Sequence, residues 1–238
     1  MPELARPIVS SRPRTLVVAI DPPELVATLI APTGAVIGTA VRAPVSDGAE
    51  PAAVLDSVWM LAEELGEFDR VTVGYPGSVA GGVTARAAGL GEAWSRFDLA
   101  TALARQSLRP ARVVDDAELV AHSAIAGAGV ELVITIGARF TASLLLDGKP
   151  LPGFDLGAHR FRKKATYADY VAGEAFEKHG RKKWNARVHK MIAALLATFA
   201  PTRLYLGGRD ARFIYGELPA NVEVLGPPSL AAALWLWA

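Results

Sequence analysis

The sequence contains no cysteine, and this absence excludes several kinds of chemistry. A chain without thiols forms no disulfide, no thiolate-ligated metal centre and no cysteine nucleophile. An excess of charge of one sign is also absent, because 25 lysines and arginines are balanced by 24 aspartates and glutamates. The net charge of +1 gives no general attraction to nucleic acid or to an anionic membrane, and we expect neither as a partner.

Long apolar runs are missing as well. No run reaches the roughly 18 residues that a membrane-spanning helix needs. The apolar tail Leu230–Ala238 has about half that length, so it predicts a helix docked on the core. The first segment, Met1–Arg14, has three prolines and three arginines but no apolar centre, which predicts a mobile leader and not a secretory signal. Together with the missing thiols, these features predict a cytoplasmic protein.

The residues that are present favour an α/β fold. Hydrophobic residues make up 51% of the 238-residue chain, which is enough for a sizeable core. The β-branched run Thr15–Ile20 predicts a buried strand, and a Pro-Thr-Gly turn joins two further predicted strands, Leu25–Ala31 and Ala35–Val41. The same kind of meander is predicted again at Val130–Ile136, Thr141–Leu146 and Lys149–Leu151.

Strands and helices alternate after each meander. The helices are predicted at Ala52–Leu65, Phe97–Gln106, Ala117–Ile125 and Lys182–Phe199, and the strands at Arg70–Gly74, Ala111–Val114, Arg203–Leu206 and Val222–Val224. Two such halves imply two mixed sheets surrounded by helices, with a cleft between them. After the leader 1–14, we place the first domain at residues 15–115 and the second at 116–227. The C-terminal helix, 228–238, is predicted to return to the first domain.

Five segments carry a resemblance to a known family. They are Asp21 after the first strand; Gly74-Tyr75-Pro76-Gly77 with Ala87–Leu90 and Trp94; Val113–Glu118; Thr135-Ile136-Gly137 with Leu146–Pro152 and Asp155-Leu156-Gly157; and Lys182–Val188 with Leu206-Gly207-Gly208. In order and spacing they resemble the ROK group of sugar kinases and repressors, and within it the polyphosphate/ATP glucokinases, over residues 15–238. The resemblance implies a two-domain, actin-like (ribonuclease-H-like) α/β fold with an interdomain cleft. It also implies a homodimer that binds a small-molecule sugar and, if active, uses Mg²⁺ with ATP or polyphosphate.

Sugar phosphorylation requires a base for the hydroxyl proton and a cradle for the phosphates. In the resembling family the base is the aspartate of an Asn-Asp pair, and Asp116 falls on that position. Asp116 also suits a cap for the helix predicted from Ala117, and the two roles are compatible. Asp115 replaces the asparagine that grips sugar hydroxyls. Two adjacent carboxylates repel, so one is expected to have a raised pKa.

The resemblance implies further sugar contacts. The loop formed by Gly74, Tyr75, Pro76 and Gly77 follows the family's Gly-Phe-Pro-Gly pattern. Gly89 replaces an asparagine, so that contact is lost. Asp155 replaces a glutamate and is one methylene shorter. His159 stands one residue later than the family's histidine, and a solvated basic loop is the alternative interpretation for it.

The first phosphate loop departs strongly from the family pattern, Asp-x-Gly-Gly-Ser/Thr-x-x-Lys. This chain reads Asp21-Pro22-Pro23-Glu24 and has Thr28 at the lysine position. Glycines let backbone amides approach phosphates, whereas a proline has no amide hydrogen to donate. Glu24 adds a negative charge where phosphate would lie. Asp21 alone is kept from this loop.

The second phosphate loop also departs from its pattern, Gly-Thr-Gly-x-Gly. This chain reads Gly137-Ala138-Arg139-Phe140-Thr141, so one glycine remains and the threonine hydroxyl is lost. Arg139 either binds an anion or, with Phe140, fills the vacated site.

Two further features lie on the phosphate side of the resemblance. Gly207 and Gly208 match the family's nucleotide-side glycines, although Arg209 follows them. Lysines and arginines also cluster in the second half, and they either line an anion path or surround a solvated helix start. They are Lys163, Lys164, Arg181, Lys182 and Lys183.

Two functions compete for this sequence. Asp116 and the Gly74–Gly77 loop favour an active hexose kinase that phosphorylates glucose with polyphosphate or ATP. The altered phosphate loops favour a non-catalytic relative that binds a small ligand or a partner protein, because each lost donor around a transferring phosphoryl group costs about 3 kcal/mol. We therefore predict impaired or absent phosphoryl transfer. A repressor with a helix-turn-helix domain is not expected, because only 14 residues precede the first predicted strand.

Overall fold

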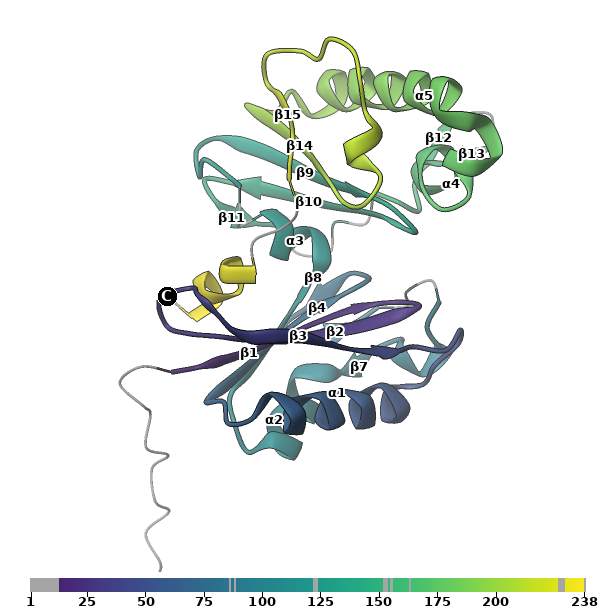
Figure 1. Ribbon diagram of the computed structural model, residues 1–238. Helices are drawn as coiled ribbons and strands as arrows, with labels where there is room; N and C mark the ends of the chain where they lie inside the picture. The colour runs from purple at the N-terminus through teal and green to yellow at the C-terminus, as the bar shows by residue number, and fades with distance from the viewer. Residues whose placement is uncertain are drawn as a thin grey trace, which may run out of the picture.

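The computed structural model describes residues 13–85, 87, 89–121, 124–151, 154, 156–162, 164–226 and 230–237. The fold is mixed α/β and contains two five-stranded sheets, with strand orders β3-β2-β1-β4-β8 and β11-β10-β9-β14-β15. Figure 1 shows the two sheets as separate layers, with the short helix α3 (Asp116–Ala121) and the C-terminal helix η3 (Leu230–Trp237) between them.

The first sheet begins with the predicted meander. Its strands are β1 (Thr15–Asp21), β2 (Glu24–Ile30), β3 (Val36–Pro44), β4 (Arg70–Tyr75) and β8 (Ala111–Asp115). The strand pairs β1–β2 and β2–β3 are antiparallel, whereas β4 is parallel to β1 and β8 is parallel to β4. The helices α1 (Pro51–Leu65) and α2 (Leu99–Ser107) cover the lower face in Figure 1. A continuous apolar run forms β1 because this strand lies inside the sheet and is buried on both faces.

Small strands and turns connect β4 to α2. They are β5 (Val79–Ala80), β6 (Val83–Thr84), the short helix η1 (Glu92–Trp94) and β7 (Phe97–Asp98). The predicted helix at Phe97 therefore starts two residues later, because Phe97 pairs with Thr84 in a strand. Asp98 ends this strand and caps α2, since its Oδ1 accepts a hydrogen bond of 3.0 Å from the Thr101 amide.

The second sheet repeats the arrangement. Its strands are β9 (Val130–Ile136), β10 (Phe140–Leu146), β11 (Lys149–Pro150), β14 (Arg203–Gly207) and β15 (Val222–Val224). The helices α4 (Tyr167–Val171) and α5 (Ala175–Phe199) pack on it, and α5 changes direction at Gly180. Two strands, β12 (Arg160–Arg162) and β13 (Ala165–Thr166), form a hairpin before α4, and the short helix η2 (Ala211–Phe213) follows β14. Trp184, Val188 and Leu195 of α5 are buried in this core, which is the apolar side that the sequence pattern predicts.

The C-terminal helix docks on the first sheet. Ala233 and Leu236 of η3 pack in one apolar cluster with β1, β2, β8 and α3. The Trp237 indole donates a 2.9 Å hydrogen bond to Thr72 Oγ1, and two guanidinium groups lie 4.9 and 4.6 Å from its ring. The segment is a 3-10 helix, so the predicted docking is found in a tighter helical form.

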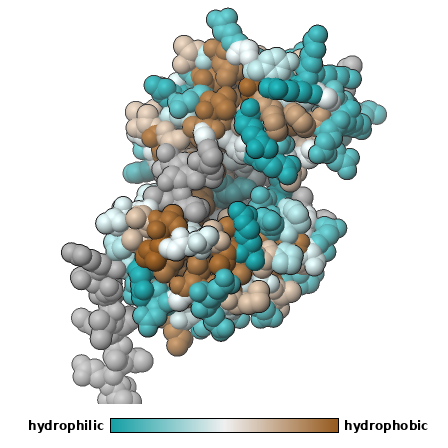
Figure 2. Space-filling view, in the orientation of Figure 1, coloured by the Kyte–Doolittle hydropathy of each residue, from teal (hydrophilic) through white to brown (hydrophobic). Residues whose placement is uncertain are grey.

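Apolar side chains also reach the surface. Figure 2 shows a hydrophobic patch on the half of the molecule that contains the first sheet. The exposed apolar side chains of that half include Val36, Ile37 and Met60. Within the described residues, no helix is both long and apolar enough to cross a membrane.

Candidate functional site

A cavity of about 810 Å³ lies where β4 and β8 end. Pro76 and Gly77, just after β4, and Asp115, the last residue of β8, contribute to its lining. The second half of the chain contributes the turn between β9 and β10, parts of α4 and the start of α5. The carboxyl ends of neighbouring parallel strands meet at one edge of a sheet, and this edge is where ligands bind in open α/β sheets.

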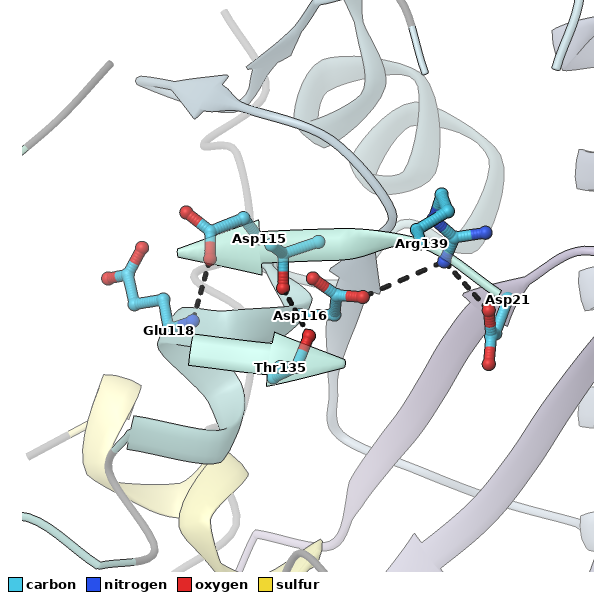
Figure 3. Close-up of polar contacts among 7 residues, drawn as sticks. Asp21, Asp115, Asp116, Glu118, Thr135 and Arg139 are labelled. Carbon is cyan, nitrogen blue, oxygen red and sulfur yellow. Dashed lines mark hydrogen bonds and ion pairs between the residues drawn. The ribbon is translucent and has the colours of Figure 1, made fainter. Parts of the chain in front are cut away.

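Arg139 joins two aspartates from different elements at this edge (Figure 3). Its Nη2 lies 2.7 Å from Oδ1 of Asp21, at the end of β1, and 3.6 Å from Oδ2 of Asp116, at the start of α3. The arginine side chain is 12% exposed, whereas Asp21 is 66% and Asp116 30% exposed. A largely buried guanidinium therefore lies between Asp21 and Asp116. The sequence analysis assigned Asp21 to phosphate binding and Asp116 to the base position.

The Asp116 side chain points toward Arg139. Burial raises its pKa, while the Arg139 guanidinium and the Thr141 hydroxyl lower it. Its Oδ1 is buried and has no hydrogen-bond partner among the described residues. Of the two neighbouring aspartates, Asp115 and not Asp116 belongs to the described lining of the cavity.

Asp115 has two roles in the geometry. Its Oδ1 accepts a 2.6 Å hydrogen bond from the Glu118 amide, so Asp115 caps α3 and the predicted cap by Asp116 is wrong by one residue. Burial and the adjacent Asp116 carboxylate raise the pKa of Asp115 to about 8. Burial raises the pKa of Glu118 to about 7. At neutral pH Asp115 is therefore mostly protonated, and its carboxyl group can donate as well as accept a hydrogen bond.

Several predicted site glycines are packed against other atoms. A Cβ at Gly208, whose φ is +88°, would lie 2.5 Å from the Ile136 carbonyl oxygen. A Cβ at Gly207 would lie 3.2 Å from a Val120 methyl carbon, and one at Gly74 would lie 3.1 Å from Leu119. The close packing of the strand ends is therefore a sufficient reason for glycine at these positions.

The predicted sugar residues do not all reach the cavity. Pro76, Gly77 and Asp115 line it, whereas the His159 side chain is exposed and lies outside the described lining. Asp155 falls outside the described residues. Tyr75 is fully buried, and its hydroxyl donates a 2.7 Å hydrogen bond to the Ala85 carbonyl oxygen, so it belongs to the core.

No protein-family model and no curated protein matches the sequence. Solved structures do match. An inorganic polyphosphate/ATP-glucomannokinase from Arthrobacter sp. strain KM superposes with a TM-score of 0.84 at 19% identity, over 94% of this chain and 98% of that one. A ROK family glucokinase from Streptomyces griseus, in complex with glucose and AMPPNP, gives 0.76 at 14% identity, over 94% and 98%. This chain has the fold of the ROK-family sugar kinases.

The same fold is found in a ROK family transcriptional regulator, a homologue of E. coli MLC. It superposes with a TM-score of 0.68 at 13% identity, over 92% of this chain and 76% of that one. The ROK fold is thus shared by proteins of different activity, and the function of this chain has to be argued from its own site.

The first phosphate loop of the ROK pattern is a tight hairpin turn here. Asp21 pairs with Glu24, so Pro22 and Pro23 alone make the turn and neither offers an amide hydrogen. Glu24 forms a 2.7 Å ion pair with Arg42 on β3, so its charge is matched within the sheet. Pro22 also packs on Gly89, where a Cβ would lie 3.2 Å from the proline ring.

The second phosphate loop is closed by its own backbone. The Gly137 amide donates a 2.9 Å hydrogen bond to the Arg139 carbonyl oxygen, and the Gly137 oxygen accepts one of 2.8 Å from Gly173. Thr141 shares a hydrogen bond with Thr135. The Gly137 backbone groups and the Thr141 hydroxyl are therefore used inside the protein.

The carboxylates beside the altered phosphate loops lie next to an arginine. Within the described part of the chain, no cluster of three or more His, Asp or Glu side chains has metal-binding geometry. The carboxylates of Asp21 and Asp116 lie 2.7 and 3.6 Å from the Arg139 guanidinium. A divalent cation at the same place would meet this positive charge.

Three basic residues of the lining were not predicted. Lys178, His179 and Arg187 of α5 all line the cavity. The sequence analysis instead named a basic cluster as a possible anion path, and its described members, Lys164, Arg181, Lys182 and Lys183, lie outside the described lining. Gly180 inside a basic stretch was the available signal for a break that turns earlier residues toward the cavity.

Proposed function

We propose that this chain is a non-catalytic protein with the ROK kinase fold that binds a small polyhydroxylated ligand, such as a sugar, and transfers no phosphoryl group. The cavity is taken as the cleft between two domains, residues 15–115 with 228–238 and residues 116–227. One observation carries the proposal: the Arg139 guanidinium ion-pairs with Asp21 and Asp116, at 2.7 and 3.6 Å.

This arrangement opposes phosphoryl transfer in two ways. A general base has to accept the proton of the substrate hydroxyl, and the Arg139 cation beside Asp116 opposes this, because it favours the ionised carboxylate. A transferring phosphoryl group also needs oriented donors, and here Pro22 and Pro23 have no amide hydrogen and the Gly137 amide is used in an internal hydrogen bond.

The same cavity keeps features that suit a ligand with several hydroxyl groups. Its volume of about 810 Å³ exceeds what a monosaccharide needs. Asp115, mostly protonated at neutral pH, offers both a donor and an acceptor at the rim. The Pro76-Gly77 turn also lines the cavity.

Calorimetry tests the proposal directly. ATP with Mg²⁺, or inorganic polyphosphate, titrated at millimolar concentration into the full chain is expected to give no binding heat. The variant Arg139→Ala removes the guanidinium, and Arg209→Ala, an exposed arginine paired with Asp210 at 3.2 Å, is the matched control. The alternative function, an active hexose kinase, is supported by the kinases among the solved structures with this fold. Tight binding of either phosphate donor to the parent chain would favour that alternative.

A homodimer is proposed as the assembly. The support is the exposed apolar side chains on β3 and α1, which include Val36, Ile37 and Met60. Analytical ultracentrifugation of the full chain is expected to give twice the monomer mass. Met60→Lys is expected to lower the fraction of the chain that is dimeric. A monomer at all concentrations would contradict it.

A further inference from the structure

The first half of α5 forms a cationic wall of the cavity, made of Lys178 and Arg187, and the His179 imidazole lies in the same lining. Within the described residues, none of the three has an ion pair with a carboxylate. Arg187 is held in place, because its Nη1 donates a 3.0 Å hydrogen bond to the Tyr170 carbonyl oxygen and its guanidinium lies 4.4 Å from the Tyr170 ring centre. The cationic wall is therefore partly preorganised, and its cations have no ion-pair partner among the described residues.

A break in the helix brings these side chains together. In a continuous α-helix, residues nine positions apart point about 180° away from each other, so Lys178 and Arg187 would face opposite sides. Gly180 interrupts α5 with φ 69° and ψ 157°, a conformation that suits glycine. As a result Lys178, before the break, and Arg187, after it, line the same cavity.

Within the described residues, the acidic side chains nearby form no ion pair with Lys178 or Arg187. Asp169 belongs to the lining but serves as the capping-box partner of Thr166, whose amide donates to it at 2.9 Å. Asp115 is mostly protonated at neutral pH. Glu174 is the remaining acid of the lining and is exposed. Lys178 and Arg187 thus share the lining with two exposed carboxylates, Asp169 and Glu174, and within the described residues they form an ion pair with neither.

Resting on the proposed ligand-binding function, we infer that the preferred ligand is anionic, a monosaccharide carrying a carboxylate or a phosphate group, with the acid group on the cationic wall. Its hydroxyl groups would face Asp115 and the Pro76-Gly77 turn. A planar guanidinium and an ammonium are the groups that proteins use to bind carboxylates and phosphates. Neutral glucose would leave both cations of the wall without a partner.

Calorimetry with three probes tests this inference: glucose, glucuronate and glucose 6-phosphate. Glucuronate, glucose 6-phosphate or both are expected to bind at least about tenfold more tightly than glucose, and raising the salt concentration is expected to weaken the anionic probes alone. The two anionic probes distinguish a carboxylate ligand from a phosphate ligand. Lys178→Gln, an exposed position, is expected to lower their affinity by about fivefold and to leave glucose unchanged. Lys182→Gln, on the same helix but outside the described lining, is the matched control.

Other results would overturn the inference. These are equal affinity for glucose and glucuronate or glucose 6-phosphate, binding of none of the probes, an equal effect of Lys178→Gln and Lys182→Gln, or binding of polyphosphate without either sugar anion. Turnover of glucose to its phosphate would instead refute the proposed non-catalytic function. The two failures are therefore distinguishable.

Discussion

Replacement of Arg139 by glutamine is expected to lower the free energy of unfolding by about 2 kcal/mol at pH 7. At an effective dielectric constant of about 20, unit charges at the 3.6 Å separation from Asp116 attract by about 4 to 5 kcal/mol. Desolvation of the two groups offsets about half or more of this attraction. Asp21 is 66% exposed, so its pair with Arg139 adds at most about 1 kcal/mol.

Urea unfolding at pH 7 and pH 5 measures this loss. Without the guanidinium, burial raises the pKa of Asp116 further, because the main opposing influence is gone. The folded variant then binds a proton that the unfolded chain does not, so its stability rises as the pH falls toward 5. The destabilisation is therefore expected to be smaller at pH 5 than at pH 7.

A surface ion pair provides the control for this experiment. Arg42 lies 2.7 Å from Glu24, but both side chains are more than half exposed. Arg42→Gln is expected to change stability by less than about 1 kcal/mol at either pH. If Arg139→Gln lowers the free energy of unfolding no more than Arg42→Gln does, the Arg139 guanidinium merely fills space and the account of the site is wrong.

Three further changes have defined outcomes. Because the pKa of Asp115 is raised to about 8, the folded chain binds the extra proton between about pH 4 and pH 8, and parent stability falls as the pH rises across that range. Asp115→Asn keeps the cap and is expected to stabilise by about 1 to 2 kcal/mol at pH 8, with little gain at pH 4, by urea unfolding. Gly208→Ala, with a 2.5 Å contact to backbone, is expected to cost about 3 kcal/mol in a denaturant melt, against about 1 kcal/mol for Gly38→Ala, which has open space and a similar φ. Gly89→Asn introduces the asparagine of the ROK pattern and is expected to lower the free energy of unfolding by about 1 kcal/mol. Adding Pro22→Gly to this variant is expected to restore part of that loss.

Much of the fold was predictable because apolar patterns have simple structural causes. The runs at Thr15–Ile20 and Val130–Ile136 are inner strands, and both are buried as continuous apolar runs predict. The predicted helix Lys182–Phe199 matches the part of α5 after Gly180. The part of α5 before Gly180, residues 175–179, was missed, because five residues are too few to show a helical period.

The candidate site was less predictable, because its contacts join distant parts of the chain. The sequence left Arg139 as either an anion-binding group or a filler, and no local pattern indicates a pair with Asp21, which is 118 residues away. The cap of α3 was misplaced by one residue, since Asp115 and Asp116 are alike in sequence and differ only in direction. The sequence likewise does not indicate that Pro22 lies against Gly89, where it leaves little space for a side chain.

Phosphoryl transfer to glucose tests the central claim most directly. The full chain is incubated with glucose, Mg²⁺ and either ATP or polyphosphate, and glucose 6-phosphate is quantified against a reaction without protein. The Arg139 ion pair with Asp21 and Asp116 predicts no product above that background for the parent chain, and no change for Asp116→Asn. Turnover by the parent chain that Asp116→Asn abolishes would contradict the account.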